Sequence, residues 1–177
     1  MSNIKVLDKE FEPYLSEELI QTKIAELAAQ FNKEYEGKRP IFLSILNGSF
    51  LFTADLFKQI TIEAEVCFIK LASYKGTTSS GNVITAIGLD ANVSGRDIII
   101  LEDIIDTGKT LHHFLPQLAS SQPNSIKIAV LLNKTEALAY PVKVDYACFD
   151  IPNKFVVGYG LDYDGYGRNT KAIYQLK

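Results

Sequence analysis

Short runs of β-branched and aliphatic residues, each followed by a segment with helical periodicity, recur along this chain of 177 residues. The clearest run is DIIIL at residues 97–101, which is apolar throughout, as expected for a strand buried on both faces. A second run, PIFLSILNGS at residues 40–49, has the same character and ends in a turn signal. Strands that alternate with helices predict an α/β fold with a doubly wound, mostly parallel sheet.

Three helices are expected along the chain. Ser16 and the acids after it are typical of a helix N-terminus, and Gly37 is expected to end that helix. Helical spacing also favours residues 50–60 and residues 110–121, where we expect Pro116 to interrupt the helix. The remaining segments with strand character are EAEVCFIKLASY (63–74), NVITAIGL (82–89), SIKIAVLL (125–132) and VDYACF (144–149).

Hydrophobic residues make up 47% of the chain, which is enough to bury one sizeable core. No linker divides the sequence, so residues 1–177 are expected to form a single domain. The end of the chain is different, because it is aromatic and glycine-rich with only short apolar runs. We expect residues 150–177, together with the N-terminal segment, to form a small hood over the edge of the sheet where a ligand binds.

Charge and hydropathy exclude several classes of function. The formal net charge of -3 provides no general positive field for nucleic acid or an anionic membrane. The first residues lack the apolar core of a signal peptide, and no segment is long enough to span a bilayer, so we expect a cytoplasmic protein without a membrane partner. Cys67 and Cys148 are far apart and show neither a disulfide framework nor metal-ligand spacing.

The segment EDIIDTGKT, residues 102–110, follows the most apolar strand and is the strongest candidate for a ligand site. In an open parallel sheet, ligands bind where the strands end and helices begin. Backbone amides and two hydroxyls in residues 106–110 would hold a phosphate there. The ending GKT resembles a nucleoside-triphosphate P-loop, but that motif requires a glycine where this chain has Asp103.

Glu102 and Asp103 would repel a phosphate unless the same ligand offered hydroxyl donors or brought a divalent cation. A ribose 5-phosphate has both a phosphate and a vicinal diol. The alternative is that these acids only cap the end of a strand and that the following residues form an ordinary turn.

The string IIILEDIIDTGKTL, residues 98–111, resembles the phosphoribosyl-pyrophosphate motif of type I phosphoribosyltransferases. Its EDIIDTGKT form is similar to that of hypoxanthine-guanine phosphoribosyltransferases, and the likeness continues through ILNGSF, ASYKG, LLNK and FVVGYGLDYDGYGR. The resemblance implies a type I phosphoribosyltransferase fold and a homodimer or homotetramer. It also implies Mg²⁺-dependent transfer of a phosphoribosyl group from phosphoribosyl pyrophosphate to hypoxanthine, with guanine as a further expected base.

The same resemblance assigns roles at the end of the central strand. Asp106 would act as the general acid/base at the N7 edge of the purine. The 5-phosphate would be bound by Asp106, Thr107, Gly108, Lys109 and Thr110. Glu102 and Asp103 would engage the ribose hydroxyls and Mg²⁺, which also offsets the charge of the leaving pyrophosphate.

By the same resemblance, Asn47 and Gly48 would bind the pyrophosphate through backbone amides, after a cis peptide bond between Leu46 and Asn47. Many relatives have Lys or Arg in place of Asn47, so any cationic contribution from that side chain is absent here. Arg168 would reach the pyrophosphate with its bidentate guanidinium. From the residues alone, Asn-Gly also fits a plain turn.

For the purine, the resemblance implies that Lys134 donates to the exocyclic O6, which would disfavour adenine. Phe155 would stack on the base, Val156 would contact it through its backbone, and Asp162 would lie near the base and a second metal ion. The alternatives are a solvated lysine and two core strand residues.

The polar stretch SYKGTTSSG, residues 73–81, would be a lid that begins with Ser73 and Tyr74 and excludes water from the reaction. An idle loop is the alternative. Two other functions stay open at this point. One is a nucleotide-sensing regulator of the same fold that binds nucleic acid, although the chain lacks a large basic cluster. The other is a receiver-like α/β signalling domain, which leaves the Gly-Lys-Thr turn unexplained.

Overall fold

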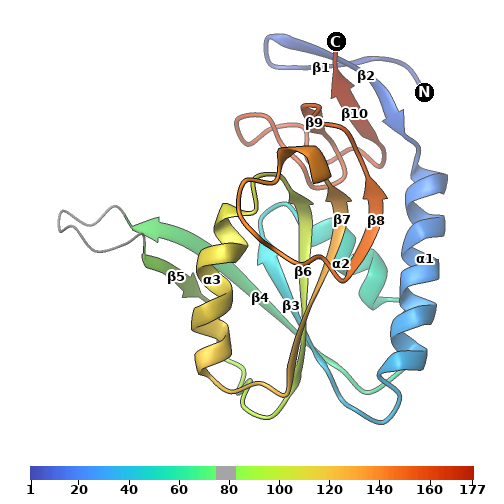
Figure 1. Ribbon diagram of the computed structural model, residues 1–177. Coiled ribbons are helices and arrows are strands. Elements are labelled where there is room, and N and C mark those ends of the chain that lie inside the picture. The colour runs from blue at the N-terminus through green and yellow to red at the C-terminus, as the bar shows by residue number, and fades with distance from the viewer. Residues whose placement is uncertain (75–82) are drawn as a thin grey trace.

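The computed structural model describes residues 1–74 and 83–177, and it describes side chains outside residues 72–87. Within these residues the main sheet has six strands in the order β5-β4-β3-β6-β7-β8 (Figure 1). All neighbouring strands are parallel except the pair β4 and β5. The predicted doubly wound, mostly parallel sheet is therefore confirmed. Its strands are β3 (Ile41–Leu46), β4 (Glu65–Tyr74), β5 (Val83–Ile87), β6 (Asp97–Ile105), β7 (Ser125–Asn133) and β8 (Tyr146–Asp150).

Helices cover both faces of this sheet. Two of them, α1 (Glu17–Glu34) and α2 (Phe50–Phe57), pack on one face, and α3 (Lys109–Ser120) packs on the other (Figure 1). The predicted cap of α1 is confirmed, because the Ser16 side chain accepts a hydrogen bond from the backbone amide of Leu19 at 3.3 Å. A short 3-10 helix, η1 (Thr135–Ala137), follows β7.

The expected interruption of α3 at Pro116 is wrong, because the helix continues through that residue. Proline has no amide hydrogen, so the carbonyl of His112 loses its usual helical partner. Leu111, Phe114 and Leu118 are nevertheless buried against the sheet on either side of Pro116. Packing of this apolar face stabilises the helix more than the missing hydrogen bond destabilises it.

A second, smaller sheet joins the two ends of the chain. Its four described strands are antiparallel, in the order β1-β2-β10-β9, and lie beyond the end of the main sheet (Figure 1). They are β1 (Ile4–Val6), β2 (Lys9–Leu15), β9 (Val156–Val157) and β10 (Ile173–Leu176). We call this sheet and the connection between β9 and β10 the hood. The N-terminal residues thus contribute two of its strands.

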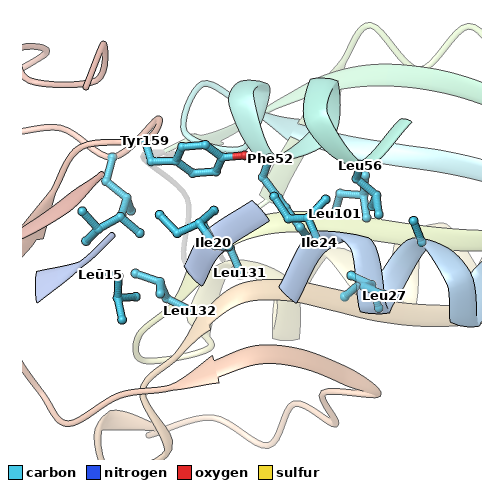
Figure 2. Packing of buried hydrophobic residues seen from close by; sticks show 14 of the residues in the cluster. Leu15, Ile20, Ile24, Leu27, Phe52, Leu56, Leu101, Leu131, Leu132 and Tyr159 are labelled. Atoms are coloured by element: carbon cyan, nitrogen blue, oxygen red, sulfur yellow. The ribbon is translucent and has the colours of Figure 1, made fainter. Parts of the chain in front are cut away.

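The hood shares a hydrophobic core with the main sheet. Figure 2 shows Leu15 and Tyr159 of the hood beside Ile20 and Ile24 of α1, and Phe52 of α2. All of these side chains are at least nine-tenths buried. Because one continuous core holds hood and sheet together, the position of one constrains the other.

Two further expectations concern the whole chain. Among the described residues, no helix has both the length and the apolar character needed to cross a membrane. Cys67 and Cys148 are both free thiols. The expected cytoplasmic location stays a prediction.

Candidate active site

The segment that connects β6 to α3 surrounds a pocket of about 110 Å³, which is lined by Glu102 and residues 104–111. All five residues predicted to bind a 5-phosphate, 106–110, line this pocket. Gly108 has a φ of 77° and precedes the first turn of α3, so the turn needs the left-handed conformation that glycine adopts readily. The helix N-terminus and its free amides therefore adjoin the pocket, as an anion site requires.

The two acids before this segment have different neighbours. Glu102 lines the pocket beside the β6–α3 segment. Asp103 instead lies against Gly48, so closely that a Cβ atom added to Gly48 would be 1.4 Å from the Asp103 Oδ2 atom. Successive side chains of a strand point to opposite faces, which explains the separation. The acids were expected to act together on the ribose and metal, and the structure places them on two sides of the strand end.

Both acids have a raised pKa, but only Glu102 lacks a hydrogen-bond partner, since Asp103 Oδ1 accepts from the Ile104 amide at 2.9 Å. Burial raises the pKa of Asp103 to about 6, and burial together with repulsion from Asp103 raises the pKa of Glu102 well above its ordinary value. The Glu102 Oε2 atom is buried without a hydrogen-bond partner in the part of the chain that the structure describes. A hydroxyl donor or a divalent cation would satisfy the Glu102 Oε2 atom.

These carboxylates fit Mg²⁺ only if the protein supplies some of the ligands of the ion and substrate or water supplies the others. In the described residues, no three Asp, Glu, His or Cys side chains converge on a common position, so the predicted set of Glu102, Asp103 and Asp162 does not form a closed cage. Mg²⁺ commonly takes one or two carboxylates and completes its shell with substrate oxygens and water. Asp103 is the best placed of the three, since Asp162 is near enough to raise the pKa of its carboxyl.

The β3–α2 loop, residues 47–49, is formed by contacts from three parts of the chain. The peptide bond between Leu46 and Asn47 is cis, as the family resemblance implied. Asn47 is exposed, whereas Gly48 is buried between Asp103 and the hood. A Cβ atom added to Gly160 of the hood would lie 2.0 Å from the Gly48 carbonyl oxygen. Side chains larger than hydrogen are thus excluded at both glycines.

A group of buried hydroxyls connects the β3–α2 loop to the strand before it and the helix after it. The Ser44 Oγ atom lies 2.7 Å from both Ser49 Oγ and Thr53 Oγ1, and Ser49 also donates to the carbonyl of Ile45 at 2.5 Å. No pattern in the sequence pointed to this group of hydroxyls. Its residues are spaced across a strand, a loop and a helix, and only the fold brings them together.

Lys134 and Asp106 meet at the edge of the site. The Lys134 Nζ atom lies 3.1 Å from Asp106 Oδ2 and 3.4 Å from the Asn153 Oδ1 atom. The Lys134 side chain is only 7% exposed, whereas that of Asp106 is 52% exposed. A buried, paired lysine argues against the alternative of a solvated surface residue. Asn153 was not singled out from the sequence.

Arg168 and Asp162 form an ion pair within the hood. The Arg168 Nη2 atom lies 2.7 Å from Asp162 Oδ1, and Arg168 Nη1 donates to the carbonyl of Gly160 at 2.7 Å. The positive charge of Arg168 also lowers the pKa of Asp103, although burial has the larger and opposite effect. Arg168 therefore lies close to both the acid and the β3–α2 loop.

The residues predicted to hold a purine come from both sheets: Lys134 follows β7, whereas Phe155 and Val156 lie at the start of β9 and Asp162 lies between β9 and β10. Phe155 is 45% exposed and its ring packs on Phe11 and Tyr163, with centroid distances of 6.2 Å and 5.9 Å. Val156 is buried in β9. An exposed ring that other rings support offers a face for stacking.

The predicted lid falls largely outside the description. Residues 75–82 lie outside the described residues. Ser73 and Tyr74 are the last residues of β4, and their side chains are not described either. Their proposed role stays a prediction.

Comparison with known proteins agrees with this geometry. A family model described as a phosphoribosyl transferase domain matches residues 12–164. The chain therefore belongs to the phosphoribosyltransferase family, and the predicted type I fold is confirmed.

Within that family, the chain is similar to proteins named hypoxanthine-guanine phosphoribosyltransferase. One from Lactococcus lactis is 47% identical over 175 residues, which cover 98% of this chain and 95% of the relative. Another, from Streptococcus agalactiae, is 44% identical over 163 residues, covering 92% and 91%. The crystal structure of a hypoxanthine phosphoribosyltransferase from Staphylococcus aureus has a TM-score of 0.87 and 39% identity, covering 94% of this chain and 91% of that one.

Proposed function

We propose that this protein is a purine salvage enzyme that transfers the 5-phosphoribosyl group from phosphoribosyl pyrophosphate to hypoxanthine, and also to guanine. The observation that carries the proposal is the contact between buried Lys134 and exposed Asp106 at the mouth of a phosphate-sized pocket. One group is a hydrogen-bond donor for a 6-oxo group, and the other is an acceptor for a ring proton. Together they match the edge of a 6-oxopurine.

In this proposal Asp106 accepts the proton from purine N7 while the other imidazole nitrogen bonds to the anomeric carbon of the ribose. Pyrophosphate leaves as that bond forms, through a transition state with oxocarbenium character. Lys134 donates to O6 with a proton that neither Asp106 nor Asn153 engages, since an ammonium group has three. Adenine offers an amino group at that position and would leave the buried lysine unpaired.

The remaining groups bind and orient the ribose and its two phosphate ends. Residues 106–110 would hold the 5-phosphate, and the amides of Asn47 and Gly48 with Arg168 would hold the pyrophosphate. Glu102 and Asp103 would accept from ribose hydroxyls or ligate Mg²⁺, and Asp162 would lie at a second metal position. Bound Mg²⁺ would neutralise charge on the pyrophosphate. The hood, with residues 150–177, would supply Phe155 and Val156 to the base.

The test is to incubate the purified protein with phosphoribosyl pyrophosphate, Mg²⁺ and one of three bases, and to separate the products by chromatography. Hypoxanthine should yield inosine monophosphate and pyrophosphate, guanine should yield guanosine monophosphate, and adenine should give no nucleotide. A chelator should stop turnover and excess Mg²⁺ should restore it. Absence of inosine monophosphate from folded protein would contradict the proposed activity.

We also propose that the protein assembles as a homodimer or homotetramer. In the similar hypoxanthine phosphoribosyltransferase from Trypanosoma cruzi, which is 32% identical with a TM-score of 0.86, the C-terminal region has a role in the oligomeric state and enzymatic activity. The C-terminal strand β10 also belongs to the hood here. Light scattering of the purified protein would give the mass of the assembly, and a monomer would contradict the proposal.

A further inference from the structure

The hood is connected to α2 through the Tyr159 hydroxyl, which the proposed mechanism does not use. This hydroxyl donates to the Asp55 Oδ2 atom at 2.7 Å, and the carbonyl oxygen of Leu51, also in α2, lies 3.5 Å away. The Tyr159 residue is 3% exposed, and Figure 2 shows its ring reaching from the hood toward α2, beside Phe52. A hydrogen bond from a buried donor to a charged acceptor is stronger and more directional than a neutral one.

The Asp55 carboxylate that accepts this bond is also held by two other side chains. Its Oδ2 atom also accepts from Gln21 Nε2 of α1 at 2.7 Å, and its Oδ1 atom forms an ion pair with Lys58 at 2.7 Å. Although burial alone would raise its pKa, the hydrogen bonds from Lys58, Tyr159 and Gln21 lower the pKa of Asp55. The carboxylate therefore stays charged and ties α1, α2 and the hood together.

Tyr159 sits in an uncommon backbone conformation. Its φ is 50°, between Gly158 and Gly160, whose φ values are both 100°. A residue with a side chain rarely adopts this left-handed region, and the conformation costs energy that surrounding contacts must offset. The bond to Asp55 and the burial of the ring provide such contacts.

The two residues joined by this hydrogen bond each belong to an element that adjoins the proposed pyrophosphate site. On one side, α2 starts at Phe50, immediately after the β3–α2 loop. On the other side, Tyr159 precedes Gly160, which packs on the Gly48 carbonyl and accepts a hydrogen bond from Arg168. The bond from Tyr159 to Asp55 thus helps to set the distance between the β3–α2 loop, which follows a strand of the main sheet, and the guanidinium of Arg168, which belongs to the hood.

We propose that Tyr159 and Asp55 are positioning residues. They hold the hood and the β3–α2 loop at the distance at which Arg168 and the loop amides can bind the same pyrophosphate. Neither residue touches the substrate in this proposal. The inference rests on the proposed function, because it names what sets the geometry of that same site. Small displacements of binding groups weaken a multidentate site strongly.

The test is Tyr159→Phe, which keeps the ring and the backbone and removes only the hydroxyl. The KM for phosphoribosyl pyrophosphate, and the KM for pyrophosphate in the reverse reaction, should each rise about fivefold, while the KM for hypoxanthine changes less than about twofold. The matched control is Tyr146→Phe, which removes a Tyr–Glu34 hydrogen bond of 2.5 Å between α1 and β8, away from the site. That control should lose similar stability without a change in either KM. Equal KM values for phosphoribosyl pyrophosphate in wild type and Tyr159→Phe would overturn the proposal.

A second measurement does not depend on activity. Hydrogen exchange of the amides in residues 47–50 should be several-fold faster in Tyr159→Phe than in wild type, and unchanged in Tyr146→Phe. Unaltered exchange in Tyr159→Phe would overturn the positioning role even if the wild type turned over normally. If the wild type showed no turnover, the proposed function would fail while the exchange data still decided whether Tyr159 orders the loop.

Discussion

The β6–α3 segment and the β3–α2 loop end neighbouring parallel strands, yet they are built in different ways. The β6–α3 segment is local: Gly108 supplies the turn, α3 supplies the amides, and Asp106, Thr107, Lys109 and Thr110 are exposed. The β3–α2 loop is assembled from distant contacts, with Gly48 buried between Asp103 of β6 and Gly160 of the hood. One site depends on a contiguous string of residues and the other on the whole fold.

This difference implies different tolerance to change. In the local segment, the proposed binding groups are mainly backbone amides, so we expect loss of one side chain to leave most of the site intact. In the assembled loop, a single added methyl group collides with another element, and the interior cannot absorb it without movement. We therefore expect substitutions in the β3–α2 loop to act through geometry and those in the β6–α3 segment to act through chemistry.

The largest effect is expected for Asp106→Asn. Asp106 is the one residue of the β6–α3 segment whose side chain is proposed to take part in the reaction itself. Asparagine keeps the shape and can still contact Lys134, but it cannot accept the purine proton. The kcat should fall about 10³-fold with little change in the KM for phosphoribosyl pyrophosphate. Steady-state kinetics with hypoxanthine would measure this. Asp90→Asn, at an exposed position, should retain full activity, and near-normal turnover by Asp106→Asn would remove Asp106 from the acid/base role.

Gly48→Ala should come next, with a loss of about 10²-fold in kcat/KM for phosphoribosyl pyrophosphate. Gly48 does not have a positive φ, so the obstacle is the contact with Asp103 Oδ2 rather than the backbone conformation. The control is Gly95→Ala, where an added Cβ meets nothing within 4 Å but φ is 69°. That variant should lose about 1 kcal/mol of stability and keep its activity. Full activity of Gly48→Ala would show that the loop is less constrained than its contacts indicate.

Asp103→Asn should stabilise the free protein while impairing catalysis. Because burial raises the pKa of Asp103 to about 6 from an ordinary value of 3.8, ionisation of this group destabilises the fold. The cost is absent below about pH 4, grows as the pH rises toward 6, and stays constant above it, with an upper limit of about 3 kcal/mol. Urea denaturation should therefore show a larger stability gain for the variant at pH 8 than at pH 5.

Asp145→Asn is the opposite control for that experiment. Burial would raise the pKa of Asp145, but hydrogen bonds from Lys127 and the Ile128 amide lower it overall. Its stabilisation is present above the unfolded pKa and is lost as pH falls, so Asp145→Asn should destabilise the protein at pH 8. A gain in stability for both variants would mean that loss of net negative charge, rather than burial of Asp103, is responsible.

The smallest effect is expected for Thr110→Val in the local segment. Valine keeps the β-branched shape and removes one exposed hydroxyl, while the backbone amides remain. The KM for phosphoribosyl pyrophosphate should rise about threefold. A loss as large as that of Gly48→Ala would contradict the distinction between the two loops.

Much of the site could be anticipated because its determinants are contiguous. The buried strand and the DTGKT turn are encoded within residues 97–110, and the cis bond before Asn47 followed from the resemblance of one short motif. The helix through Pro116 could not be anticipated from local propensity, because packing of its apolar face outweighs the missing hydrogen bond. Asn153 and Asp55 carried no local signal for these contacts, since the partners concerned, Lys134 and Tyr159, lie far away in the sequence.

The sequence by itself determined the alternation of strands and helices in the main sheet, its mostly parallel order and the candidate anion-binding segment, because periodicity, turn residues and helix caps act over a few residues. Only the tertiary structure decided that Glu102 and Asp103 face different neighbours, that Lys134 is buried against Asp106, and that Tyr159 connects the hood to α2. These contacts join residues from separate elements, and their distances depend on how the elements pack. The chain therefore predicted which residue types meet at the candidate site, and the shared core decided their geometry.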